Sequence, residues 1–483
     1  MTRLLPRPLG ALAILALASA PLGAQGAAPM SISLDDALRL AAGVSHTVRA
    51  AEAGVLRARG QQSQARSQYF PQLTASAGYQ RTIQSQFQEI SKRDQDSGGS
   101  SGGGSSDSDS SSNNFGGITK IFASPVTQTI TLNFSQNIFT AGRVEAANAG
   151  ARAARTAADI GLDAARAQMA LDVAQAYFDA VAAARLAEIS DSTLAQAERS
   201  LQNTTLAHEV GSASEFDLLR ARVARDNQRP AVIQAKGNRD VALLRLRQLL
   251  GIPLAQPLTL TTPIRDDGVL PTVALDQPIA IPGTQQSVRP DTSAARRSTV
   301  RIAEATVDAQ RAALRAASWQ RFPSLLVSST YQRFGYPADG ELFPNSFGLF
   351  YPNWTVTAGL SFPLFTGGRI TGDRMVAEAN LHEAQENLAQ AREVAELDAR
   401  TAVTQLEQAQ AAYAASVGTD EQAAKAYGIA EVRQREGIST EVELQQSRTQ
   451  YEQARLNRVL AARDLEVARL RVALLKDLPV ARR

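Results

Sequence analysis

Few residues in this chain have types and spacings that could carry chemistry. The 483 residues include no Cys and three scattered His, at His46, His208 and His382. Their number and spacing exclude disulfide frameworks, zinc fingers, thiol nucleophiles and His-rich metal sites. The sequence also lacks a phosphate-binding Gly-x4-Gly-Lys-Ser/Thr loop, a His-Glu-x-x-His motif and a nucleophile elbow. We therefore predict no enzyme activity, no cofactor and no metal site, and we interpret the three His as ordinary exposed or interface residues.

Two carboxylates share a spacing. Asp217 lies six residues after Gly211, and Glu443 lies six residues after Gly437. Each Gly interrupts a long stretch rich in Ala, Gln, Arg and Glu, so each acid would fall in the first turn of the helix that resumes after the break. One interpretation is that both acids simply satisfy the dipole of that helix. The other is that they select ions.

The overall composition points to long helices rather than to a nucleic-acid partner. Lys and Arg number 50 against 47 Asp and Glu, a net charge of +3, so neither sign dominates. Aromatic residues make up only 5% of the chain. Such a composition is typical of extended helical proteins.

Residues 1–28 have the layout of a secretory signal peptide. Arg3 and Arg7 precede an apolar stretch over 9–20, and small residues follow it. The apolar part is too short to span a bilayer as a helix, and no later segment reaches the roughly 18 apolar residues that such a helix needs. We expect the chain to be exported, and any membrane-spanning part to consist of β-strands.

The rest of the chain is a tandem duplication. Gly211 and Gly437 lie 226 positions apart, and the residues around them match at the same offset. The motif Ile-Phe-Thr-Ala-Gly-Arg at 138–143 recurs as Leu-Phe-Thr-Gly-Gly-Arg at 364–369, again 226 positions later.

Upstream of these landmarks the offset changes. Phe70-Pro71-Gln72-Leu73 matches Phe322-Pro323-Ser324-Leu325 at 252 positions, so the first half carries an insertion of 26 residues. The Ser/Gly/Asp-rich run over 97–114 accounts for it, because such a segment cannot bury enough apolar surface to fold alone.

Proline placement outlines the helices, because helix interiors tolerate Pro poorly. The absence of Pro between Pro125 and Pro230, and between Pro363 and Pro479, predicts long helices over about 142–207 and 368–433. At about 1.5 Å per residue each would be roughly 95–100 Å long. Each then turns back at its Gly, which predicts two helical hairpins with tight tips.

Four short segments alternate between apolar and small polar residues and are predicted to be strands. With flanking residues each is about ten long, the size of a tilted strand across the hydrocarbon of a bilayer. Two hairpins on a soluble core are the alternative, but the helices offer no wide apolar stripe to cover the apolar faces. The four segments are 73–79, 126–134, 325–331 and 354–362.

Four strands cannot close into a barrel, and an open edge in lipid leaves backbone groups unsatisfied. The chain must therefore associate: two copies would give eight strands, and three would give twelve, the first size with a lumen. The strand-to-helix turns Gly142-Arg143 and Gly368-Arg369 would then lead each second strand into a long helix.

Beyond the duplication, four motifs occur in order along the chain: Leu34-Asp35-Asp36-Ala37-Leu38-Arg39-Leu40-Ala41, Phe70-Pro71-Gln72-Leu73, Arg289-Pro290-Asp291 and Phe322-Pro323-Ser324-Leu325. With these motifs, the chain resembles the TolC-like outer membrane efflux proteins over essentially all of its mature sequence. The resemblance implies a homotrimer with a 12-stranded β-barrel in the outer membrane, continued by a 12-helix α-barrel in the periplasm. It also implies docking to a periplasmic adaptor (membrane fusion) protein and to an inner-membrane pump or ABC exporter.

The same resemblance gives the hairpin tips a role. It implies that the tips dock the adaptor, and that Asp217 and Glu443 form rings of carboxylates at a periplasmic gate, which would favour cations. A second acid and a Tyr/Arg latch known in the family do not transfer, because those positions carry Gln446, Gln434 and Ser439. The implied docking residues are Val210, Gly211, Ser212, Glu436, Gly437 and Ile438.

The predicted fold is therefore mainly α with a small β part: an internally duplicated chain of four long helical regions and four membrane strands. The predicted function is a passive outer-membrane exit duct of a tripartite efflux or type I secretion system, reaching into the periplasm, with its cargo left open. The alternative is a periplasmic coiled-coil scaffold without a pore. The predicted divisions are a signal peptide (1–28), a first repeat (29–250) with an extracellular loop (81–125), a Pro-rich linker or equatorial region (251–290), a second repeat (291–478) with an aromatic-rich loop (333–353), and a tail (479–483). We expect the 333–353 loop either to fold over the barrel mouth or to be an ordinary surface loop.

Overall fold

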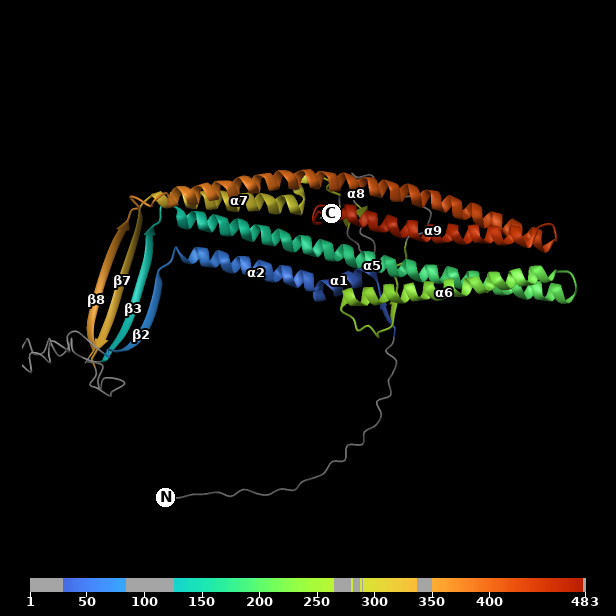
Figure 1. Ribbon diagram of the computed structural model, residues 1–483, viewed down its shortest axis with the longest axis horizontal. Helices are drawn as coiled ribbons and strands as arrows, with labels where there is room; N and C mark the ends of the chain where they lie inside the picture. Colours follow the sequence, from blue (N-terminus) through green and yellow to red (C-terminus); the bar gives the residue numbers. More distant parts are fainter. Residues whose placement is uncertain are drawn as a thin grey trace, which may run out of the picture.

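The computed structural model describes residues 29–83, 126–264, 279–280, 287–288, 290–336 and 350–480. The molecule is elongated, with a β-sheet at one end and long helices running from it to the other (Figure 1). Within the described ranges, no helix is long and apolar enough to cross a membrane. The predicted signal peptide, the 97–114 run and most of the two predicted extracellular loops lie outside the described residues.

The four alternating segments predicted from the sequence are strands. They form one antiparallel sheet in the order β2-β3-β7-β8. Apolar side chains on this sheet remain exposed, among them Trp354, Val356 and Leu360 at 72%, 68% and 70%. The strands are β2 (Gln72–Arg81), β3 (Val126–Phe139), β7 (Ser324–Gly335) and β8 (Phe350–Ser361).

The long helices form two hairpins, as predicted. α5 and α8 each have 67 residues and are about 100 Å long at about 1.5 Å per residue. α5 packs against α6 and α9, and α8 packs against α9. The tips of both hairpins lie at the end farthest from the sheet (Figure 1). The helices are α5 (Arg143–Glu209), α6 (Glu215–Leu250), α8 (Arg369–Arg435) and α9 (Glu441–Ala473).

Shorter helices complete the half of the molecule next to the sheet. α2 packs against α5, and α7 packs against both α5 and α8, so this half has the order α2, α5, α7, α8, matching that of the strands. The shorter elements are α1 (Leu34–Val44), α2 (His46–Ser67), α7 (Ser298–Ser318) and the 3-10 helices η1 (Ala294–Arg296) and η2 (Trp319–Arg321).

The two strand-to-helix turns share one backbone geometry. Gly142 and Gly368 precede α5 and α8 with φ of 80° and 85°, a region that favours glycine. The N–H of Arg143 donates to Thr140, and that of Arg369 donates to Thr366, both at 3.1 Å. The two turns differ in their surroundings, because the ring of Trp319 lies directly over Gly142 whereas Gly368 faces open space.

The middle of the molecule holds a core around Tyr177 of α5, which is fully buried. Its hydroxyl donates to the carbonyl of Ile32 at 3.1 Å and accepts the N–H of Thr262 at 2.8 Å. These two contacts fix a short parallel pair of strands, β1 (Met30–Ile32) and β4 (Leu258–Leu260), beside the helices.

The predicted linker over 251–290 is less irregular than its seven prolines indicate. Its described part contains β4 and the antiparallel pair β5 (Ile279–Ala280) and β6 (Ser287–Val288). The prolines flank these strands, and the strand residues themselves keep their backbone donors.

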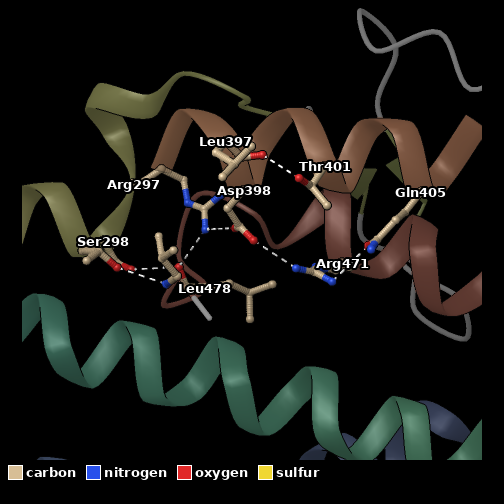
Figure 2. A network of polar contacts seen from close by, with 10 residues as sticks. Arg297, Ser298, Leu397, Asp398, Thr401, Gln405, Arg471 and Leu478 are labelled. Carbon is tan, nitrogen blue, oxygen red and sulfur yellow. Dashed lines mark hydrogen bonds and ion pairs between the residues drawn. The ribbon is translucent and has the colours of Figure 1, made fainter. Parts of the chain in front are cut away.

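A buried ionic network ties the second half together near the end of α9 (Figure 2). The fully buried Arg297, just before α7, donates to Asp398 Oδ2 of α8 at 2.7 Å. Arg471 of α9 donates to Asp398 Oδ1 at 3.0 Å, and Ser298 Oγ donates to the Leu478 carbonyl at 3.0 Å. One carboxylate therefore joins three helices.

Candidate functional site: the two hairpin tips

The two hairpin tips have the same turn. Gly211 and Gly437 have φ of 76° and 72°, so each allows the chain to leave its helix in a left-handed conformation. In the first tip, Ser212 N–H donates to the Ala207 carbonyl at 2.8 Å; in the second, Ile438 N–H donates to the Arg433 carbonyl at the same distance. The predicted docking residues lie at these turns, and Val210 and Ile438 are 79% and 69% exposed.

Asp217 lies in the first turn of α6, where it completes a capping box with Ser214. Ser214 Oγ accepts the N–H of Asp217 at 3.1 Å, and Asp217 Oδ2 accepts from Ser214 Oγ at 2.6 Å and from Ser214 N–H at 3.3 Å. Hydrogen bonds from the side chain and backbone of Ser214 lower the pKa of Asp217. The structure thus places this acid in a capping box at the start of α6.

Glu443 occupies the equivalent place in α9. Its N–H donates to Thr440 Oγ1 at 3.3 Å, and its Oε2 accepts from Ser439 Oγ at 2.8 Å. Arg433, at the end of α8, lies 3.6 Å from its other oxygen. This exposed pair spans the tip and neutralises part of the carboxylate charge. The gate role of both acids remains a prediction.

The residues at the family's latch positions make other contacts here. Gln434 Nε2 donates to Glu441 Oε2 at 3.4 Å, and Ser439 binds Glu443. Gln446 is exposed on α9.

A buried polar cluster behind the second tip was not predicted from the sequence. Arg448 of α9 is 6% exposed and donates through Nη2 to the Thr193 carbonyl of α5. Glu441 accepts from Ser200 Oγ of α5 at 3.0 Å. Burial raises the pKa of Glu441 and of Glu452, and burial lowers that of Arg448.

This cluster fastens the second hairpin to α5. Tyr427 of α8 stacks on Tyr451 of α9 with ring centres 5.7 Å apart, beside the Arg448 contact. Arg448 sits among Arg and Gln residues of a long polar helix, so its burial could not be read from α9 alone. The available sequence signal was an equivalent Arg at position 222, 226 residues earlier.

The three His residues lie on different helices and form no common site in the described part of the chain. His46 begins α2, His382 lies exposed on α8, and His208 Nδ1 lies 3.0 Å from the Ala213 carbonyl in the first tip. In the part of the chain that the structure describes, no group of three or more His, Cys, Asp or Glu is placed to hold a metal ion.

The duplicated strand, helix and hairpin units agree with one known family along most of the chain. The family profile of the outer membrane efflux proteins matches residues 37–252 and 290–475, which leaves out the linker between the repeats. The chain belongs to the outer membrane efflux protein family. The predicted resemblance to the TolC-like outer membrane efflux proteins is thereby confirmed, and so is the predicted fold class, mainly α with a small β part.

Two curated relatives of the same family match half of the chain. These are the probable efflux pump outer membrane protein SepC and the toluene efflux pump outer membrane protein TtgF, both of Pseudomonas putida. Each is 32% identical over 237 residues, which cover 47% of this chain and 44% of the relative. The match therefore spans less than half the length of either relative.

Two solved structures share the fold along nearly the whole chain. A membrane protein from Pseudomonas aeruginosa superposes with a TM-score of 0.69 at 19% identity, covering 92% of this chain and 93% of that chain. The outer membrane protein VceC of Vibrio cholerae gives a TM-score of 0.68 at 18% identity, covering 91% and 95%.

Proposed function

We propose that this outer membrane efflux protein is the passive exit duct of a tripartite efflux or type I secretion system. In this proposal it conducts substrate from a periplasmic adaptor and an inner-membrane pump or ABC exporter to the outside of the cell. It lies in the outer membrane and extends into the periplasm. Membership of the family and the likeness of the fold support this proposal.

The distribution of apolar surface is the observation that carries it. The sheet at one end exposes large apolar side chains to the surroundings, including Leu73 and Tyr79 of β2 at 64% and 57%. Exposed apolar patches of this kind on a sheet fit a lipid environment. From that end, α5 and α8 extend about 100 Å, a length suited to crossing an aqueous compartment.

The open sheet edges support assembly into a homotrimer. In the described residues β2 and β8 are the outer strands of the sheet, so each would leave backbone groups unpaired in lipid. Three copies would supply a 12-stranded β-barrel and, through their long helices, a 12-helix α-barrel. Residues 1–28 would act as the signal peptide that directs export.

The hairpin tips are proposed as the adaptor-docking end. Val210, Gly211 and Ser212 of one tip and Glu436, Gly437 and Ile438 of the other lie at the end opposite the sheet (Figure 1). Their exposed apolar side chains offer contact area for a partner helix. Asp217 and Glu443, just behind, would line the periplasmic gate.

The native mass of the membrane-extracted protein in detergent tests the proposal. Light scattering, with the detergent contribution subtracted, is expected to give three times the mass of the processed chain, in the membrane fraction only. A soluble monomer or dimer in the periplasm would contradict the duct and favour the coiled-coil scaffold without a pore.

A further inference from the structure

The two sequence repeats make the same contacts with the same register. Leu73 pairs with Phe134 between β2 and β3, and Leu325 pairs with Leu360 between β7 and β8. Adding the repeat offsets of 252 and 226 positions to the first pair gives the second. The strands of the two halves are therefore equivalent residue by residue.

The helices keep the same equivalence. Arg166 of α5 lies 3.6 Å from Glu52 of α2, and Arg392 of α8 lies 2.9 Å from Glu304 of α7. These two ion pairs are related by the same offsets, 226 for the arginines and 252 for the glutamates. A contact between two residues in one half therefore predicts a contact between the equivalent residues in the other half.

Among the described residues, the contact between the two halves occurs once in a chain. At that contact β3 pairs with β7, and α5 packs against α7 and α9. The equivalents of β3 and α5 are β8 and α8, at one edge of the molecule. The equivalents of β7, α7 and α9 are β2, α2 and α6, at the opposite edge (Figure 1).

We propose that a second copy of this chain repeats the contact, so that β8 and α8 of one copy bind β2, α2 and α6 of the next in the register set by the internal one. The inference rests on the proposed association of copies and specifies which residues meet. Asn133 pairs with Thr330 within the chain. The equivalent pair between copies is Gly359 with Gly78, followed by Leu360 with Ala77.

The predicted strand register passes an independent test of side-chain faces. Along β8, Leu360 and every second residue from it are apolar, whereas Gly359 and every second residue from it are small or polar. Over 72–80, β2 alternates in the same way, with Ala77 on the apolar face and Gly78 on the polar one, and only its last residue, Arg81, departs from the pattern. In the proposed register, the apolar residues of β8 and of β2 from the next copy lie on the same side of the sheet. A slip of one residue would place the apolar residues of one strand beside the polar residues of the other.

A polar contact is predicted between the hairpins. Arg448, which donates to the carbonyl of Thr193, is equivalent to Arg222 of α6, and Thr193 is equivalent to Thr419 of α8. Both arginines and both threonines are retained in the repeats. Arg222 and Thr419 are exposed in the single chain. Arg222 of one copy would therefore donate to the Thr419 carbonyl of the next.

The two threonines already share a local geometry. Thr193 Oγ1 donates to the Ile189 carbonyl at 3.0 Å, and Thr419 Oγ1 donates to the Ala415 carbonyl at 2.9 Å, each four residues back. The helix that would accept the hydrogen bond therefore has the same local geometry at Thr193 and at Thr419. Arg222 is the same residue type as Arg448, so its side chain is long enough to make the equivalent contact.

Disulfide cross-linking in membranes tests the strand register, because the full chain has no Cys of its own. The double variants G78C/G359C and A77C/L360C cover both classes of directly opposite pair, with Cα atoms about 5.5 and 4.5 Å apart. Gly78 and Gly359 face open space, so an added side chain meets no obstacle. Within one chain the two edges lie about 14 Å apart, three strand spacings, so any bridge joins two copies.

At least one of these pairs is expected to give a covalent trimer on a non-reducing gel. The matched variants S76C/G359C and Q80C/G359C, slipped by two residues on the same face, are expected to give none, because diagonal neighbours lie about 7–8 Å apart, beyond disulfide reach. Bridging in a slipped variant instead would overturn the register while leaving the trimer intact. A native mass of one chain would overturn both.

The Arg222 contact has a separate test. Arg222→Ala is expected to weaken association of detergent-solubilised copies roughly tenfold or more, the share of one hydrogen bond from a charged donor. Asn227→Ala on the same helix is the control, because its equivalent, Gln453, is exposed in the second hairpin. Equal association of the two variants would overturn the Arg222 contact.

Discussion

At the scale of single residues, Ser214 and Asp217 decide how α6 begins. Each satisfies a backbone donor that the helix itself leaves free, and together they make a closed capping box. The same device opens α1, where Ser33 and Asp36 are bonded in the same way and the bonds lower the pKa of Asp36. Asp217 and Asp36 therefore stabilise the first turns of α6 and α1, respectively.

We predict that Ser214→Ala speeds amide hydrogen exchange in the first turn of α6 about fivefold, the effect of losing roughly 1 kcal/mol of capping. Ser212→Ala is the control, because its hydroxyl donates back to the Ala207 carbonyl at the end of α5. Similar exchange of the α6 amides in both variants would show that the cap does not hold this turn.

The contribution of Asp217 is also predicted to depend on pH. Its pKa in the folded chain is lower than the ordinary value of 3.8. The stability it contributes is therefore present above pH 3.8 and lost as the pH falls through the lowered pKa. Amide exchange in the first turn of α6, corrected for its intrinsic pH dependence, should accelerate in that acid range in the wild type. In Asp217→Asn it should already be fast at neutral pH.

At the scale of elements, the turn from β3 into α5 depends on Gly142 for two reasons. Its φ is positive, and a Cβ built there would lie 2.0 Å from the ring of Trp319. Gly368, its equivalent, shares the first condition but not the second. The pair therefore separates backbone strain from steric overlap.

We predict that Gly368→Ala costs about 1–2 kcal/mol of stability through its positive φ. Gly142→Ala should cost a further 1–3 kcal/mol or so, because the Trp319 ring must shift. The midpoints of thermal unfolding of the two variants, measured in the same detergent, give the difference. Equal midpoints would mean that Trp319 yields without cost.

The strands offer a test of the lipid-facing surface. Val356 is 68% exposed on the apolar face of β8, and Thr357 points to the opposite face. Arg facing lipid near the bilayer midplane costs about 2–4 kcal/mol. We therefore expect Val356→Arg to lower the amount of assembled protein in the outer membrane, and Thr357→Arg to be tolerated. Equal tolerance of both would favour the pore-free scaffold.

At the scale of the whole molecule, the duplication builds an elongated structure from two halves with the same arrangement of strands and helices. Each half supplies two strands of the sheet, a short helix next to the sheet and a long helical hairpin. In the proposed assembly, the contact between two copies repeats the contact between the two halves. The buried network of Arg297, Asp398 and Arg471 lies where α7, α8 and α9 meet, and it fixes the second half at its middle.

The ion preference of the assembled duct tests the gate hypothesis. If Glu443 forms a ring around the pore, Glu443→Gln should shift the reversal potential in a KCl gradient away from cation selectivity. Glu436→Gln removes the same charge from the turn of the same tip and is the control. An unchanged potential in Glu443→Gln, or an equal shift in both variants, would mean that Glu443 only caps α9 and pairs with Arg433.

The four strands of the sheet, the long helices and the hairpin tips could be predicted from the order of the amino acids alone. Periodicity of two marked all four strands, proline-free stretches marked α5 and α8, and Gly211 and Gly437 marked the tips, because each signal comes from the backbone requirements of neighbouring residues. The resemblance to the family was also visible in the sequence, because the duplication and the four motifs that carry it are properties of residue order and spacing.

Which polar side chains are buried, and what they bind, could not be predicted before the packing of the helices was known. Arg297 and Arg448 look like ordinary residues in or beside polar helices, and their burial arises only when helices distant in sequence pack side by side. The pairing of β1 with β4, which lies in the predicted linker, escaped prediction for the same reason, because the two strands lie more than 220 residues apart. Local patterns specify a helix or a strand, whereas the cost of burying a charge is met by partners that the fold alone brings together.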